Sequence, residues 1–394
     1  MSNFRAAFDK ETKRHLLVLL GIITLVTAIS IIWFIHDGIN YQESYNLKLS
    51  SGSGKQIIWG SNDDPMPLYS LLLHAYNHLI GRASLFWDRV LSLAAYVALI
   101  IVCYLLGRIA SGRSFVGLIS AALISFSPFM IWYANRATVY SLLALMVALN
   151  QLCFIGIYKH RNWSLPAYLL TSILGLALHF FFLAIVLPEI LFLIMKRRDL
   201  KRYEYWFGLS FAIISIAAFS LWVVYSSKYG INYWRYLPFT AKPSATNAFI
   251  IYFQYLFGFQ PVVITTLIIA LWPLLVILAL LAVQKYVRPP ISIQYLFVNA
   301  VLPILLLFMV SWIWKPLFLS SYLIVCLPSF LIFIAWYLSA FRLQALTIAR
   351  YSLVLGMIVM LIFELSNWRL ALQQDYLGTS QESFKTLSLE YKKP

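Results

Sequence analysis

Charged side chains are scarce in this 394-residue chain, and acidic ones are the scarcest. Only 11% of the residues are charged, with 14 Asp and Glu against 30 Lys and Arg, whereas 62% are hydrophobic and the mean hydropathy is +0.81. Soluble domains are about 45–50% apolar and about 25% charged. We therefore expect an integral membrane protein that is solvated mainly by lipid.

Cysteine is also rare, and its placement excludes two classes of site. The three cysteines, Cys103, Cys153 and Cys326, lie inside apolar runs and form no CxxC pair. Neither a disulfide framework nor a zinc site is indicated. The first apolar run follows a basic stretch and lacks a small-residue cleavage site, so we interpret it as a retained span.

The net charge of +16 would suggest nucleic-acid binding in a soluble protein. In a chain this hydrophobic, basic residues instead mark cytoplasmic loops and contacts with anionic headgroups. The expected partners are therefore membrane lipids and not nucleic acid.

Long apolar runs are abundant, and a spanning helix needs about 20 such residues. We predict an all-α membrane protein of about 11 transmembrane helices, with the N-terminus inside and the C-terminus outside. The runs lie near residues 15–35, 86–107, 114–132, 139–158, 164–178, 180–195, 206–227, 262–284, 293–313, 317–340 and 351–367. The run 164–195 could also be one long tilted helix, but that would place the basic cluster at 196–202 outside, against the positive-inside rule.

This topology divides the chain into a membrane domain, residues 1–367, and a short extracytoplasmic tail, residues 368–394. The outer side would carry a first loop at 37–84 and a later loop at 225–261. Within the later loop, residues 248–257 are too short to span and are expected to lie in the interface. Glu189 falls inside a span, where we expect a basic cytoplasmic residue as its partner.

Four of the few carboxylates fall in the first outer loop: Asp37, Glu43, Asp63 and Asp64. Asp63 or Asp64 can cap a juxtamembrane helix in which Leu68, Leu72, Tyr76 and Leu79 share one face and Gly81 supplies the stop. Capping alone would explain Asp63 and Asp64, but capping and catalysis can coexist. We expect this helix to lie on the outer surface with its acidic end turned toward Glu43.

An ordered series of short motifs covers about a third of the chain. It runs through Gln42-Glu43-Ser44-Tyr45, Met66-Pro67-Leu68-Tyr69, Trp87-Asp88-Arg89, Tyr104 to Arg108, Ser127 to Tyr133, Tyr140 to Leu143, and His179. No single motif is specific, but their order is. The series resembles the membrane glycosyltransferases of the type C superfamily, in the protein mannosyltransferase and aminoarabinose transferase branch.

The resemblance implies transfer of a sugar from a polyprenyl-phosphate carrier to an acceptor protein, glycan or lipid, at the outer face of a bacterial cytoplasmic (inner) membrane. An outer-loop carboxylate would act as base and cations would stabilise the leaving phosphate. No cofactor is required, and a divalent cation is left open. The alternatives are a non-catalytic relative that binds a lipid carrier or a partner enzyme, and a lipid or solute transporter, for which no repeated halves are visible.

The chain departs from the family pattern at two places. Gln42 stands where the family has its proposed catalytic Asp, and the residues from Asn135 to Thr138 replace a Gln-Glu-Ala-Arg segment. The candidate catalytic residues are therefore Glu43, Asp63 and Asp64, with Asp37 a further candidate for the base.

Substrate or phosphate binding is assigned to Arg136, Arg235, Lys242, His179 and Tyr140. Headgroup contact is the commoner explanation for any single cation, and a hydrogen-bonded structural role is the commoner one for His179.

Overall fold

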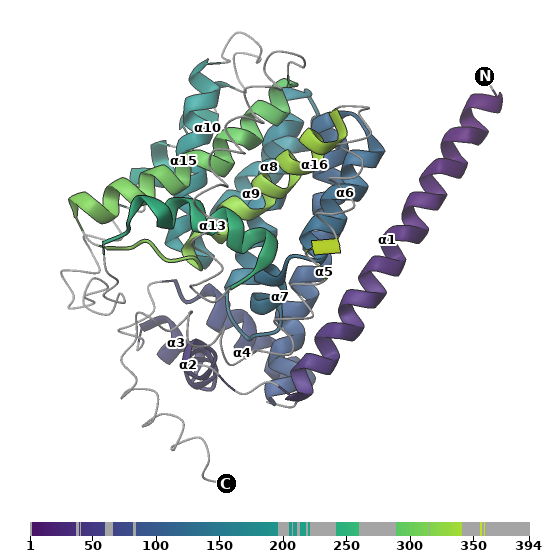
Figure 1. Cartoon of the computed structure of the whole chain (residues 1–394). Helices are drawn as coiled ribbons and strands as arrows, with labels where there is room; N and C mark the ends of the chain where they lie inside the picture. Colours follow the sequence, from purple (N-terminus) through teal and green to yellow (C-terminus); the bar gives the residue numbers. More distant parts are fainter. Residues whose placement is uncertain are drawn as a thin grey trace.

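The computed structural model describes residues 2–36, 39, 41–59, 66–81, 84–195, parts of 205–220, 242–259, 289–314, 316–340, and 355, 356 and 358. Every regular element in these ranges is a helix, which confirms the predicted all-α class. The helices form one bundle, with α1 (Ser2–His36) along one side of it (Figure 1).

Five segments in the described ranges are long and apolar enough to cross a membrane. They are α1, α5 (Leu85–Ser111), α8 (Tyr140–Tyr158), α15 (Ile291–Ile313), and the 3₁₀ turn η3 (Tyr322–Cys326) continued by α16 (Leu327–Ala340). The predicted spans at 262–284 and 351–367, and most of 206–227, fall outside the described residues. The count of eleven and the orientation therefore remain predictions.

The predicted third span, 114–132, is a bent pair of helices that together are long and apolar enough to cross a membrane. The segment forms α6 (Ser114–Ser125) and α7 (Pro128–Ala134), with a bend of 62° between them. Ser127 takes an extended conformation, and its side chain accepts the Met130 amide at 3.3 Å as N-cap of α7. Pro128 then occupies the first helical position, where its missing amide costs nothing. The sequence Ser127-Pro128 thus begins a new helix within a long apolar run.

The predicted break after residue 178 is confirmed. Helix α9 (Ser164–Leu178) ends at His179, whose backbone is extended, and η1 (Phe180–Phe182) leads into α10 (Leu183–Met195). Within α10, Glu189 is fully buried and accepts hydrogen bonds from the hydroxyls of Tyr168 at 2.7 Å and Tyr295 at 3.0 Å. The expected basic partner is therefore wrong: two tyrosines from neighbouring helices take its place.

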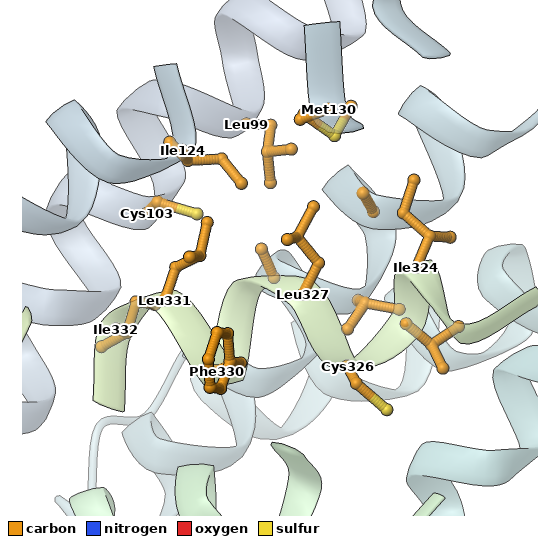
Figure 2. Close-up of a cluster of buried hydrophobic side chains, with 14 of the residues drawn as sticks. Leu99, Cys103, Ile124, Met130, Ile324, Cys326, Leu327, Phe330, Leu331 and Ile332 are labelled. Carbon is orange, nitrogen blue, oxygen red and sulfur yellow. The ribbon is translucent and has the colours of Figure 1, made fainter. Parts of the chain in front are cut away.

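The core of the bundle lies where α5, α6 and α16 meet. Apolar side chains from α5, α6 and α7 face those of η3 and α16 (Figure 2). Helices α5 and α6 approach especially closely, because a Cβ added at Gly117 would lie 2.5 Å from the carbonyl oxygen of Tyr104. This packing holds the C-terminal part of α5 against α6, and the candidate site lies at the opposite end of α5, around Arg89.

Three short helices gather at one end of the bundle, the end that α1 reaches at its C-terminus (Figure 1). They are α2 (Tyr41–Ser50), α3 (Gly54–Trp59) and α4 (Leu68–Ile80), and α4 contacts α2, α3, α5 and α9. Helix α4 is the predicted juxtamembrane helix, and Gly81 ends it with φ 68°. Its N-cap is Pro67, so the capping role expected of Asp63 or Asp64 is wrong for α4.

The segment expected to lie in the interface is part of α13 (Ala245–Phe257), which packs on α7 and α15. Ile251, Phe253, Tyr255 and Leu256 are buried. The Ser127 hydroxyl donates to the Tyr255 carbonyl at 2.6 Å, which ties α13 to the bend between α6 and α7. One face of this helix is thus packed against the bundle, and its placement at the membrane interface stays a prediction.

Candidate functional site

A fully buried ion pair joins α2 to the bundle. The Arg89 guanidinium, in the first turn of α5, donates from Nε to Glu43 Oε1 at 2.7 Å and from Nη2 to Oε2 at 2.8 Å. Neither side chain is exposed. This two-pronged geometry is the strong form of an arginine–carboxylate contact, and it fixes α2 against α5.

The same carboxylate also holds the turn between α7 and α8. Glu43 Oε1 accepts the Ala137 amide at 2.9 Å, and Asn46, one turn further along α2, donates to the Ala137 carbonyl at 3.0 Å. Both backbone polar groups of Ala137 are thus satisfied from α2. Helix α2 positions residues 135–139, where the chain departs from the family pattern.

A second chain of contacts reaches this turn from α4. The Tyr69 hydroxyl lies 3.4 Å from Ser92 Oγ, and Ser92 donates to the Thr138 carbonyl at 3.3 Å. Burial, more than the opposing effect of the Ser92 contact, raises the pKa of Tyr69 far above its ordinary value. Tyr69 therefore stays a neutral hydroxyl, and α4 and α5 are linked through it.

Gln42, at the position of the family's proposed base, is exposed and donates from its amide to the Tyr140 hydroxyl at 3.2 Å. Tyr140 begins α8, and its ring lies 4.9 Å from that of Tyr133 and 6.1 Å from that of His179. Two of the predicted binding residues, Tyr140 and His179, thus lie together near Gln42.

Arg136 is buried, with 1% of its surface exposed. Its guanidinium carbon lies 3.3 Å from the centroid of the Trp132 ring, and Nη1 donates to the Trp132 carbonyl at 3.1 Å. A desolvated cation over an indole face is a stabilising arrangement. Its position beside Ala137 places a permanent positive charge next to the peptide that Glu43 holds.

Three buried polar side chains in the same region have no hydrogen-bond partner among the described residues: both amide atoms of Asn135 and the hydroxyls of Thr138 and Ser141. Each is at most 2% exposed. Buried polar groups are nearly always paired, so such a concentration marks a place where water or a polar ligand completes the pairing.

His179 lies at the break between α9 and η1, among the rings of Phe180, Phe181 and Tyr322. This apolar burial lowers the pKa of its imidazole from 6.5 to about 4. Nδ1 accepts the Phe181 amide at 3.2 Å, so the neutral ring carries its proton on Nε2. His179 is therefore both structural and a neutral donor beside Tyr140.

The remaining predicted site residues are not brought to this cluster. Asp63, Asp64 and Arg235 lie outside the described residues, as does Asp37. Lys242 is exposed just before α13, 5.2 Å from the Trp312 ring centroid, and no hydrogen bond joins it to Glu43 or its neighbours in the described ranges. Those ranges also contain no group of three or more His, Cys, Asp and Glu residues that could hold a metal ion.

Arg89 lies in one of the quoted motifs but was not among the predicted site residues. An unpaired arginine at the start of an apolar span is energetically costly, so its presence there indicates a buried acidic partner. Its partner, 46 positions earlier, could not be chosen by spacing.

Comparison with known proteins gives a match at the level of structure. No protein-family model and no curated protein sequence matches the chain. Apo ArnT from Cupriavidus metallidurans superposes with a TM-score of 0.56 at 12% identity, covering 91% of this chain and 78% of ArnT. ArnT bound to undecaprenyl phosphate gives 0.54 at 12%, covering 92% and 73%. The fold implied by the motif series is confirmed: this integral membrane protein has the fold of ArnT, an aminoarabinose transferase of the type C glycosyltransferase fold.

Proposed function

We propose that the protein is a glycosyltransferase that takes its sugar from a polyprenyl-phosphate carrier at the outer face of a bacterial cytoplasmic membrane. The observation that carries the proposal is the shared fold with a protein that has been solved bound to undecaprenyl phosphate. The basic residues on the predicted cytoplasmic loops support the outward placement of the acidic first loop.

In the proposed reaction, an acceptor hydroxyl or amine attacks the anomeric carbon of the donor. The bond between that carbon and the phosphate oxygen breaks as the new glycosidic bond forms. The acceptor proton passes to a carboxylate, and polyprenyl phosphate leaves with the electrons of the broken bond. Such a site needs a base on one side and positive charge on the other.

The contacts of Glu43 favour a positioning role for this residue. A base must be reachable by the acceptor proton, whereas Glu43 is fully buried and engaged by Arg89 and Ala137. We assign the base to Asp63 or Asp64, the two other candidate carboxylates that the sequence places in the same loop. Glu43 would act through the peptide at Ala137, which it holds beside Arg136.

Arg136 and the unpartnered polar groups of Asn135, Thr138 and Ser141 would bind the donor. A buried guanidinium can donate hydrogen bonds to a lipid-linked phosphate, and side-chain amide and hydroxyl groups can form hydrogen bonds with sugar hydroxyls. Tyr140 and His179, the second a neutral donor, lie near enough to line the same site. Arg235 and Lys242 remain candidates for phosphate or headgroup contact.

The test uses the full chain in nanodiscs with a radiolabelled polyprenyl-phosphate sugar and membrane extract as acceptor source. Transfer of label to the extract, or release of free polyprenyl phosphate, is the expected result. Asp63→Asn and Asp64→Asn should lower this transfer while leaving thermal stability unchanged.

The second candidate function is a non-catalytic lipid-carrier binder, and the amide of Gln42 at the usual base position favours it. Saturable binding of undecaprenyl phosphate without consumption of any polyprenyl-phosphate sugar would establish that function and overturn the transfer reaction.

A further inference from the structure

We propose that His74 and His78 bind a divalent transition-metal ion, with Zn²⁺ as the reference ion, on the surface of α4. The site lies outside the cluster around Glu43, and the proposal does not depend on the transfer reaction. It is carried by the spacing of the two rings, by the hydrogen bond of His74 and by the exposure of His78.

The two histidines are four residues apart on α4, so their side chains project from the same face of the helix. Their ring centroids are 4.4 Å apart, at an angle of 75°. Helical histidines with this spacing hold zinc in metalloprotease motifs, because both rings reach one point in space. In the proposed site, the exposed His78 ring turns so that one nitrogen of each ring binds the same ion.

His74 is oriented by its contact with α2. Its Nδ1 lies 2.9 Å from the carbonyl oxygen of Ser50, and a carbonyl can only accept, so Nδ1 carries the proton. The lone pair is therefore on Nε2. A ligating histidine almost always donates its other nitrogen to a carbonyl or carboxylate in this way, which fixes both the ring and the tautomer.

His78 is exposed and has no hydrogen bond or ion pair among the described residues. It is therefore open to an ion from solvent.

Imidazole nitrogens select the ion class. They suit Zn²⁺, Ni²⁺ and Cu²⁺, whereas Mg²⁺ and Ca²⁺ prefer oxygen ligands. Two protein ligands leave the remaining coordination positions to water or to an incoming anionic group. Because His74 is tied to the end of α2, an ion bridging the two rings would stabilise the contact between α2 and α4.

The test is isothermal titration of Zn²⁺ into the full-length protein, purified with a histidine-free tag and stripped with chelator. One Zn²⁺ should bind per chain and raise the melting temperature, while Mg²⁺ should do neither. Cu²⁺ should give an electron paramagnetic resonance spectrum with coupling from two imidazole nitrogens.

His78→Gln should lower the Zn²⁺ affinity at least about tenfold, the low end of what losing even an outer-shell partner costs. The matched control is His160→Asn, at an exposed turn where the backbone φ is 51° and asparagine is tolerated; its Zn²⁺ affinity should equal that of the wild type. The proposal is overturned if the wild type shows no saturable Zn²⁺ binding, or if His78→Gln binds as tightly as the control.

Discussion

Arg89 holds both carboxylate oxygens of Glu43 through contacts of 2.7 and 2.8 Å, at a point where neither side chain meets solvent. Removing one partner of a buried ion pair leaves an uncompensated charge and costs about 3–5 kcal/mol. Glu43→Gln should therefore lower the melting temperature and the yield of folded protein, in addition to any loss of sugar transfer.

The matched variant replaces both partners by apolar or neutral groups of similar volume, since a whole pair can be exchanged at little cost. Glu43→Gln combined with Arg89→Met should regain most of the lost stability without regaining transfer, because the Ala137 peptide is no longer held by a carboxylate. A Glu43→Gln protein as stable as the wild type would contradict the account of this ion pair.

Asn135 gives the opposite expectation. Its buried amide has no hydrogen-bond partner among the described residues, so Asn135→Ala removes no hydrogen bond of that side chain and should leave stability nearly unchanged. If the amide binds the donor sugar, the KM for the polyprenyl-phosphate sugar should rise about tenfold, which corresponds to one lost hydrogen bond. Steady-state transfer rates and melting curves separate the two effects.

Gln151 is the control for Asn135. Its side-chain amide is equally buried and unpartnered in the described part of the chain, but it lies eleven residues further along α8 than Tyr140, or roughly 16 Å at 1.5 Å per residue. Gln151→Leu should leave the KM for the donor unchanged. An equal rise in KM for both variants would remove the sugar-binding role from Asn135.

His179 predicts how stability depends on pH. Its folded pKa is about 4 against an ordinary value of 6.5, so the unfolded chain binds the proton more readily. The stability that the neutral ring contributes is complete above pH 6.5 and is lost as the pH falls from 6.5 toward 4. His179→Asn, which keeps an acceptor for the Phe181 amide, should flatten the melting-temperature profile in that window; an unchanged profile would contradict the assignment.

Gly117 tests the close packing that places α5. A methyl group there would collide with the backbone of Tyr104, and overpacking of this kind costs about 1–3 kcal/mol. Gly117→Ala should lower the melting temperature. Gly21→Ala in α1 is the control, because nothing lies within 4 Å of its added Cβ and helix propensity improves; a fall of equal size in both variants would contradict this packing.

The sequence was informative where local chemistry decides the structure. Composition predicted the all-α membrane class, the apolar spacing from Leu68 to Leu79 predicted α4, and His179 marked the break after α9. The bend at Ser127 was missed although its serine and proline are local, because the surrounding apolar run was long enough for a single span.

Partners that are distant in the chain could not be chosen from the sequence. Glu43 was a candidate because carboxylates are rare in this chain, but only the folded structure shows that Arg89 pairs with it. Glu189 was expected to meet a cation, whereas tertiary packing supplies two tyrosine hydroxyls. Both errors have one cause: a buried carboxylate takes its partner from whichever helix lies beside it.

The most direct test of the central claim is to incubate the purified protein in nanodiscs with a labelled polyprenyl-phosphate sugar and acceptor extract, and to measure release of polyprenyl phosphate by mass spectrometry. The account predicts release by the wild type and release at least about a hundredfold slower by the Asp63→Asn, Asp64→Asn double variant, the low end of what a general base contributes, at equal melting temperature. Donor that binds but is never consumed, or a double variant as active as the wild type, would contradict it.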